Sequence, residues 1–496
     1  MSTKRHLAFD LGAESGRAIV GEIIDGKLQL TEIHRFATQG IHVNGSMRWD
    51  VYRLFGELKE GIRKYVAVYG SELSTIGVDT WGVDFGLLDK RGKLIGIPYH
   101  YRDKRSEGTD EILELKMGHE RVYELTGIQF LYINTINQLI SMKRDNDPSL
   151  EIAQDMLFMG DLLHYFLSGK VCAEYTLASV SQLYNTTKCE WSDEIFDAFD
   201  IPKSLQTKVV RAGDQIGNIR GDLAKETGIS PQTIIVAPGV HDTASAFAAA
   251  PSEGENWAAI SSGTWSLAGL EIDKPITNKA SFEMNISNSG GVLNKTLFLK
   301  NVMGLWIIQQ CKKTWNNTEP DLGYGEIVTR AHSTKPFAGM IDPDDSAFLN
   351  PQNAPQAVAD YLKKTGQSSV DPNDVGQIAR IVFEGLALKY RNVFGKLASA
   401  TDKRIEVLHI MGGGIKNEML NQFAANSMNL RIIAGPIEAT AAGNILMQAY
   451  GVGEIDSLAQ LRSVVRDSFD LKTYEPQDTK DWESAYQSFL KVCAIE

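Results

Sequence analysis

Cysteine is scarce in this chain. Only four occur among 496 residues, and none stands in a C-x-x-C pair or at zinc-binding distance from a histidine. This pattern excludes a disulfide scaffold and favours neither a redox nor a structural zinc site. We therefore expect reduced thiols at Cys172, Cys189, Cys311 and Cys493.

Long hydrophobic runs are also missing. No stretch approaches the ~18 apolar residues that a membrane-spanning helix needs. The N-terminus reaches Asp10 after only a few apolar residues, whereas a secretory signal peptide carries a longer apolar segment. The sequence therefore predicts a cytoplasmic protein.

Positive charge is in deficit. Lys and Arg number 50 against 62 Asp and Glu, which gives a net charge of −12. Such a surface repels a phosphate backbone, so nucleic acid and anionic membranes are not expected as partners. An anionic small molecule is still compatible with this charge, because backbone N–H groups and metal ions hold phosphate on acidic proteins. The two familiar single-loop nucleotide motifs, G-x-x-x-x-G-K-[ST] and G-x-G-x-x-G, are both absent.

The remaining composition is that of an ordinary globular protein, with 43% hydrophobic and 23% charged residues. The order of the predicted elements repeats along the chain. Strands at 7–10, 18–24 and 27–33, a helix at 51–69 and a strand at 74–78 are followed by strands at 257–260 and 266–272, a helix at 378–397 and a strand at 405–411. In both halves a turn rich in Gly and Ser follows the first strand. The polar stretch 251–255 separates the copies, so we expect two domains, 1–250 and 251–496, with the last helices packing back on the first domain.

Two duplicated α/β halves resemble the actin-like, ribonuclease-H-like ATPase fold, in which Gly-rich hairpins from both halves face one nucleotide across an interdomain cleft. The first candidate hairpin reads D-L-G-A-E-S-G-R from Asp10. An acid at the end of a buried strand suits Mg²⁺, and the turn that follows can present backbone N–H groups to ATP phosphates. The alternative is a strand-capping Asp before an ordinary hairpin.

Two further turns belong to the second half. Ser261–Ser266 offers hydroxyls and backbone groups to the β- or γ-phosphate, although small polar residues are common in any turn. Gly412–Gly414 opens a helix, and adjacent glycines allow a close backbone approach, here to adenosine.

Two candidate sites for sugar chemistry lie in the first half. Asp242 begins a helix after a Gly-containing turn and His241, a position that suits a general base but equally an ordinary N-cap. Trp81 and Gly82 end a strand and together offer an apolar face with an open edge for a sugar ring; the alternative is a buried aromatic beside a turn.

Taken together, these strings make the chain similar to the FGGY family of carbohydrate kinases over roughly residues 5 to 450. The resemblance is carried by the strings at Asp10, D-T-W-G-V-D-F at Asp79, G-V-H-D-T-A-S-A at Gly239, S-S-G-T-W-S at Ser261, L-K-N-V-M-G-L-W-I-I-Q at Leu299, G-G-G-I-K-N at Gly412 and E-A-T-A-A-G-N at Glu438.

The resemblance implies an ATP-dependent kinase that converts L-rhamnulose to L-rhamnulose 1-phosphate in rhamnose catabolism, with Mg²⁺ and with no obligate protein partner. It makes Asp242 the acceptor of the proton from the 1-hydroxyl. The implied sugar contacts are Gly82, His241, Asp242, Thr243 and Asn301, and the implied ATP contacts are Ala13, Glu14, Ser15, Gly16, Arg17, Thr264, Gln309 and Gly413, with Asp10 holding Mg²⁺ through phosphates and water. By spacing alone, Asn301 and Gln309 would be two polar residues at the start of a helix. Arg17 is expected either to bind phosphate or to brace its loop.

Two alternatives stay open at this point, and a third is not expected. A kinase for another deoxyketose, L-fuculose above all, would share this pattern. An actin-like ATPase without a sugar substrate would show ATP turnover that does not depend on sugar. A sugar-sensing regulator on the same fold usually carries a DNA-reading helix-turn-helix ahead of the first phosphate loop, whereas Asp10 already lies in that loop.

Overall fold

The computed structural model describes residues 4–493 and divides the chain into two compact units. The first unit contains the chain up to Pro251, then Glu271–Phe298 and Ala439–Phe469. The second contains Ser252–Leu270, Leu299–Glu438 and the chain from Asp470 onward. Within the described residues, no helix is both long enough and apolar enough to cross a membrane.

The first unit is built on a sheet with the order β13-β14-β6-β1-β2-β3. The strands of the whole unit are β1 (Arg5–Leu11), β2 (Ser15–Ile24), β3 (Lys27–Ala37), β4 (Ile41–Val43), β5 (Ser46–Arg48), β6 (Thr75–Thr80), β7 (Phe85–Asp89), β8 (Ala153–Phe158), β9 (Ala173–Glu174), β10 (Tyr184–Asn185), β11 (Glu190–Trp191), β12 (Val209–Val210), β13 (Gln215–Asn218), β14 (Ile234–Val236) and β17 (Ser287–Gly290). Its helices are α1 (Val51–Tyr69), α2 (Thr109–Lys116), α3 (His119–Thr126), α4 (Thr135–Arg144), α5 (Ser149–Ile152), α6 (Met159–Ser168), α7 (Tyr175–Ser179), α8 (Asp193–Ala198), α9 (Gly221–Thr227), α10 (Asp242–Ala248), α11 (Lys279–Glu283), α17 (Ala439–Gly451) and α18 (Leu458–Ser468).

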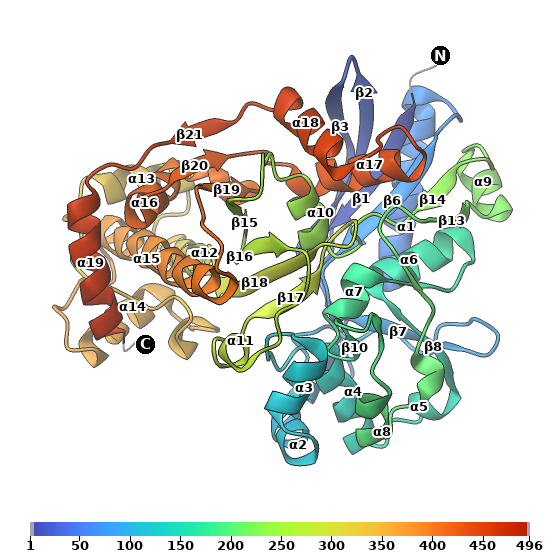
Figure 1. Cartoon of the computed structure of the whole chain (residues 1–496), viewed down its shortest axis with the longest axis horizontal. Helices are drawn as coiled ribbons and strands as arrows, with labels where there is room; N and C mark the ends of the chain where they lie inside the picture. The colour runs from blue at the N-terminus through green and yellow to red at the C-terminus, as the bar shows by residue number, and fades with distance from the viewer. Residues whose placement is uncertain (1–3, 494–496) are drawn as a thin grey trace. The chain divides into compact units, whose positions relative to one another are not determined.

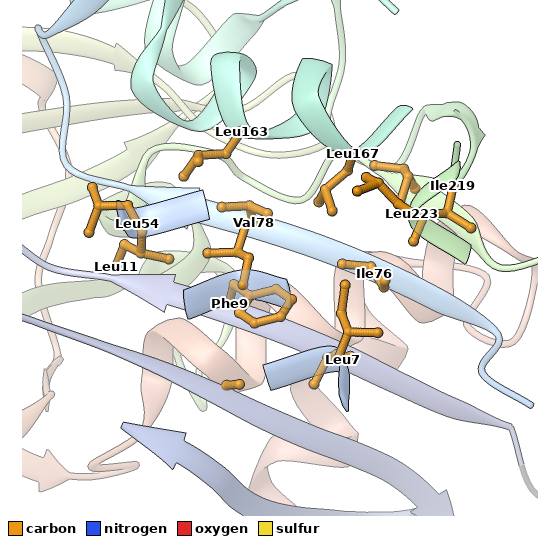
Figure 2. Packing of buried hydrophobic residues seen from close by; sticks show 14 of the residues in the cluster. Leu7, Phe9, Leu11, Leu54, Ile76, Val78, Leu163, Leu167, Ile219 and Leu223 are labelled. Carbon is orange, nitrogen blue, oxygen red and sulfur yellow. The ribbon is translucent and has the colours of Figure 1, made fainter. Parts of the chain in front are cut away.

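One face of this sheet forms a hydrophobic core. Side chains alternate between the faces of a strand, so Leu7, Phe9 and Leu11 of β1 point to the same side. There they pack with Ile76 and Val78 of β6 and with leucines of α1 and α6, all almost completely buried (Figure 2). Helix α1 begins at Val51 and ends at Tyr69, as the spacing of its apolar residues predicts.

The opposite face of the sheet is covered by α17, which lies beside β1 (Figure 1). This face is polar. The side-chain amide of Gln448 donates to the Leu7 carbonyl, and the Thr75 hydroxyl donates to the Gln448 side-chain oxygen at 2.6 Å. The intervening residues of β1, including Asp10, therefore point toward a layer that can satisfy buried polar groups.

Helix α17 also packs tightly against α10, the helix that begins at Asp242. A Cβ built on Gly443 would lie only 1.8 Å from the carbonyl oxygen of Ser245. Only glycine permits this approach, which explains why the E-A-T-A-A-G-N string needs Gly at that position.

The second unit repeats the same plan. Within its sheet, the strands of this unit follow one another in the order β18-β16-β15-β19-β20-β21. The strands are β15 (Trp257–Ser262), β16 (Trp265–Ile272), β18 (Thr296–Met303), β19 (Val407–Met411), β20 (Arg431–Ala434) and β21 (Lys472–Tyr474), and the helices are α12 (Trp306–Trp315), α13 (Tyr324–His332), α14 (Ala354–Lys364), α15 (Val375–Thr401), α16 (Glu418–Met428) and α19 (Thr479–Val492). Asn301 therefore lies in strand β18, and the interpretation that it starts a helix is wrong; only Gln309 lies in a helix, α12.

Candidate active site

Two carboxylates lie side by side at the ends of the central strands of the first unit. Asp10 of β1 is the register partner of Asp79 on the parallel strand β6, and both residues are buried. Oδ2 of Asp10 accepts a hydrogen bond from Arg17 at 2.5 Å, and Oδ2 of Asp79 accepts one from the Asn444 amide at 2.5 Å. Burial raises the pKa of Asp10 against the opposing charge of Arg17.

The pKa of Asp79 is raised well above its usual range by burial first and then by the negative charge of Asp10. Its Oδ1 is buried and has no hydrogen-bond partner within residues 4–493. Two adjacent buried carboxyl groups repel each other when both are ionised. Such a pair therefore favours binding a proton or a cation.

The donors fit Mg²⁺ in one specific way. Within the described chain, no group of three or more His, Cys, Asp or Glu side chains could enclose a metal ion alone. Mg²⁺, however, usually keeps several waters and takes one or two carboxylates together with substrate phosphates. Asp10, at the mouth of the β1–β2 hairpin, suits that arrangement.

Asp242 presents one oxygen for chemistry. Its Oδ1 accepts hydrogen bonds from the backbone N–H of Thr243 at 2.6 Å and from the Thr243 hydroxyl at 3.1 Å. No hydrogen bond within the described chain reaches Oδ2, and the side chain keeps 33% of its accessible surface. Desolvation raises the pKa of Asp242 to about 6, against the opposing Thr243 hydrogen bonds. This value suits a general base near neutral pH.

The third carboxylate belongs with the first two. The charge of Asp242 raises the pKa of both Asp10 and Asp79, so the three groups interact through space. The sequence places them far apart, and the sheet register together with α10 brings them to one end of the first unit.

His241 is neutral at physiological pH, because burial lowers its pKa to about 4. Its Nε2 lies 3.6 Å from Oδ1 of Asp242, while its buried Nδ1 has no partner in the described part of the chain. A Cβ on Gly82 would lie 3.4 Å from this same Nε2. Gly82, His241, Asp242 and Thr243 are therefore brought together.

Asp84, which belongs to the W-G-V-D-F segment, holds this segment in place through hydrogen bonds. This buried carboxylate accepts hydrogen bonds from the indole N–H groups of Trp49 at 2.6 Å and Trp81 at 3.0 Å, and from Gln138 at 2.9 Å. Burial raises its pKa to about 6. Trp81 is thus fixed by its indole nitrogen, with its ring 4.0 Å from that of Trp49.

Val83, between Gly82 and Asp84, has a φ of +71°. A β-branched residue rarely adopts this conformation, and such strain is stored where a site fixes it. The Val83 carbonyl is held by hydrogen bonds from Thr135 and Gln138. The strain supports a functional role for this turn.

The first hairpin is closed by backbone bonds. The N–H of Gly12 donates to the Ser15 carbonyl at 3.0 Å, and the hydroxyl of Thr38 donates to the Gly12 carbonyl at 2.6 Å. Glu14 and Ser15 are exposed at the tip and Ala13 is half-buried. A Cβ on Gly16 would lie 2.4 Å from the Phe36 ring, so this glycine has a packing role.

The second unit carries a matching hairpin, Ser262–Trp265, on which the start of α12 rests. The N–H groups of Leu305 and Trp306 donate to the carbonyls of Gly263 and Thr264 at 3.1 Å each. The Thr264 hydroxyl donates to the side-chain oxygen of Gln309 at 3.3 Å. The structure therefore brings Thr264 and Gln309 together.

The three glycines after β19 differ from one another. A Cβ on Gly412 would lie 2.9 Å from the Ser262 carbonyl, and one on Gly414 would lie 2.0 Å from the Ser262 hydroxyl. Nothing lies within 4 Å of a Cβ on Gly413. The outer two glycines are needed for packing against β15, and the middle one leaves open space beside the backbone.

Two groups of residues have roles that the sequence analysis does not assign. Asn444 of α17 holds Asp79, and Glu174 and Thr176 contact the backbone beside Asp242. The E-A-T-A-A-G-N string contains Asn444, and its position on a helix facing a sheet was the available signal. Glu174 and Thr176 stand in no recognised string.

Comparison with known proteins agrees with this geometry. Residues 6–248 match the N-terminal domain, and residues 258–452 the C-terminal domain, of the FGGY family of carbohydrate kinases. The chain is 42% identical over 97% of its length to a rhamnulokinase of Bacteroides thetaiotaomicron, and 37% identical over 98% to a rhamnulokinase of Bacillus subtilis, covering 98% of each relative. A crystal structure of gluconate kinase from Lactobacillus acidophilus has a TM-score of 0.83 at 16% identity, over 99% of this chain and 98% of that one.

The expected α/β fold of the actin-like, ribonuclease-H-like ATPase class is confirmed by that structural likeness and by the repeated sheet. Both family models together span most of the chain. The chain therefore belongs to the FGGY family of carbohydrate kinases.

Proposed function

We propose that this sugar kinase transfers the γ-phosphoryl group of ATP to the 1-hydroxyl of L-rhamnulose, giving L-rhamnulose 1-phosphate and ADP. The similarity to two proteins named rhamnulokinase supports the choice of sugar. The observation that carries the chemistry is Oδ2 of Asp242, which no hydrogen bond within the described residues reaches, while Oδ1 of the same carboxylate accepts from Thr243 and lies 3.6 Å from Nε2 of His241.

In this proposal Asp242 is the catalytic base. As the 1-hydroxyl oxygen attacks the γ-phosphorus, its proton passes to Oδ2, and the bond from the γ-phosphorus to the bridging oxygen breaks to release ADP. Thr243 fixes the carboxylate through Oδ1, which orients Oδ2. Phosphoryl transfer asks a protein mainly for such positioning and for charge neutralisation.

The other site residues have distinct tasks. Gly82, His241 and Thr243 contact the sugar, and Asn301 supplies a further contact. Ala13–Arg17, Thr264, Gln309 and Gly413 contact ATP. Residues 1–250 thus supply the sugar site apart from Asn301, the first phosphate loop and Asp242, and residues 251–496 supply Asn301, the second loop and the adenosine contact. Mg²⁺, bound with ATP near Asp10, would neutralise phosphate charge.

We assign Arg17 to bracing the first hairpin as well as to binding phosphate, because its guanidinium pairs with Asp10. Since the reaction consumes ATP, we place the protein in the cytoplasm, with ATP and L-rhamnulose as its ligands and without an obligate protein partner.

An ADP-release assay across ketoses tests the choice of sugar. L-rhamnulose, L-fuculose, D-xylulose, L-ribulose and glycerol are compared at equal concentration. We expect the largest kcat/KM with L-rhamnulose and almost no ADP release without sugar. A larger kcat/KM with L-fuculose would make L-fuculose, and not L-rhamnulose, the substrate. Full turnover without sugar would indicate an ATPase.

A further inference from the structure

The segment that leads into Asp242 is held from two sides. On one side, the N–H of Thr80 at the end of β6 donates to the Val240 carbonyl at 2.8 Å, and Thr80 forms an isolated parallel bridge with His241. A Cβ on Gly160 of α6 would lie 2.3 Å from the Val240 side chain. The Val240 backbone is therefore hydrogen-bonded to β6, and the Val240 side chain packs closely against α6.

The second side is formed by Glu174 and Thr176, at the junction of β9 and α7. Oε2 of Glu174 accepts the N–H of Val240 at 3.3 Å, and the Thr176 hydroxyl accepts the N–H of His241 at 2.9 Å. The consecutive N–H groups of Val240 and His241 thus donate to two neighbouring side chains.

These two side chains are themselves fixed. Oε2 of Glu174 also accepts the N–H of Thr176 at 2.9 Å and the Thr176 hydroxyl. The N–H of Glu174 donates to Oδ1 of Asp161 at 3.0 Å. Glu174, Thr176 and Asp161 are all buried, so no water competes for these bonds.

We propose that Glu174 and Thr176 are positioning residues that set the direction of the Asp242 carboxylate by holding the backbone N–H groups of Val240 and His241. Neither side chain contacts the reacting atoms in this proposal. They act through the backbone, and an error of about 1 Å in such a position can cost about 100-fold in rate. The inference rests on the proposed role of Asp242 as base.

The test compares Thr176→Val, Thr176→Ser and Thr227→Val in steady-state assays with L-rhamnulose and ATP. Valine keeps the shape of Thr176 but removes the acceptor for His241, whereas serine retains it. Thr227 is a matched control, because within the described residues its buried hydroxyl donates only to the Leu223 carbonyl of its own helix. Thermal melting of each variant measures the cost to stability.

We expect Thr176→Val to lower kcat by about 10- to 100-fold with an unchanged KM for ATP. Thr176→Ser should restore kcat, and Thr227→Val should keep wild-type kcat at a similar melting temperature. A Thr176→Val enzyme with wild-type kcat would overturn the proposal. If Thr176→Val does not fold, Glu174→Gln decides, because the amide is a weaker neutral acceptor for the Val240 N–H; a lowered kcat supports the proposal and an unchanged kcat overturns it.

Asp242→Asn, assayed beside these variants, separates the role of Asp242 as base from the positioning role of Glu174 and Thr176. An active Asp242→Asn enzyme removes the base assignment itself. An inactive Asp242→Asn enzyme together with a fully active Thr176→Val enzyme removes only the positioning role.

Discussion

The two units share one strand pattern but carry different chemistry. In each, a central strand pairs antiparallel with the next strand in sequence and parallel with a later one: β1 with β2 and β6, and β15 with β16 and β19. The pattern then continues to a second parallel pair and an antiparallel edge, β6-β14-β13 and β19-β20-β21. The pairing of these strands therefore does not distinguish the two units.

The difference lies at the ends of the central strands. The register pair Asp10 and Asp79 in the first unit corresponds to Ser261 and Met411 in the second. The first unit gathers three interacting carboxylates there, while the second offers hydroxyls and glycines without charge. The two units therefore present similar hairpins whose strand ends differ in charge.

The largest effect is expected from a substitution in the first unit. Asp242→Asn removes the proton acceptor, so we expect kcat to fall by about 10²- to 10⁴-fold with ATP affinity largely retained. Kinetics with L-rhamnulose and nucleotide titration measure both. The control is Asp50→Asn at the N-cap of α1, where Asn caps as well as Asp and full activity is expected. Wild-type turnover by Asp242→Asn would remove the base from the mechanism.

A smaller effect is expected from the second unit. Thr264→Val removes a hydroxyl of the second loop, which donates to Gln309. The loss of about one hydrogen bond to ATP should raise the KM for ATP roughly 10-fold and leave the KM for sugar unchanged. Thr329→Val, an exposed helical threonine of the same unit, is the control. A kcat defect as large as that of Asp242→Asn would contradict the division of labour between the units.

The smallest effect concerns the glycines after β19. Gly414→Ala places a methyl group against Ser262, so we expect the free energy of unfolding to fall by about 1–3 kcal/mol. Gly413→Ala, its matched control, meets open space and should change stability by less than about 0.5 kcal/mol. If Gly413 contacts adenosine, this second variant should still raise the KM for ATP. Chemical denaturation without nucleotide measures the stabilities, and equal losses would contradict the packing argument.

The sequence supports much of the fold, because apolar spacing and Gly-rich turns are local signals. The helix from Val51 to Tyr69 and the duplicated strand order followed from them. Which residues distant segments bring into contact could not be predicted from these local signals. Asn444 reaches Asp79 across 365 positions, and Thr176 reaches His241 across 65. The strain at Val83 is also invisible locally, because a valine at positive φ contradicts its own propensity.

The most direct test of the account is the pH dependence of kcat/KM for L-rhamnulose in the wild type and in Asp242→Asn. Desolvation raises the pKa of Asp242 to about 6, and a base must be ionised to accept a proton. We therefore predict that wild-type kcat/KM rises about tenfold per pH unit below pH ~6 and levels off above it, while Asp242→Asn, which keeps Asp84 and Glu174, loses this limb. An unchanged acid limb in Asp242→Asn would contradict the assignment.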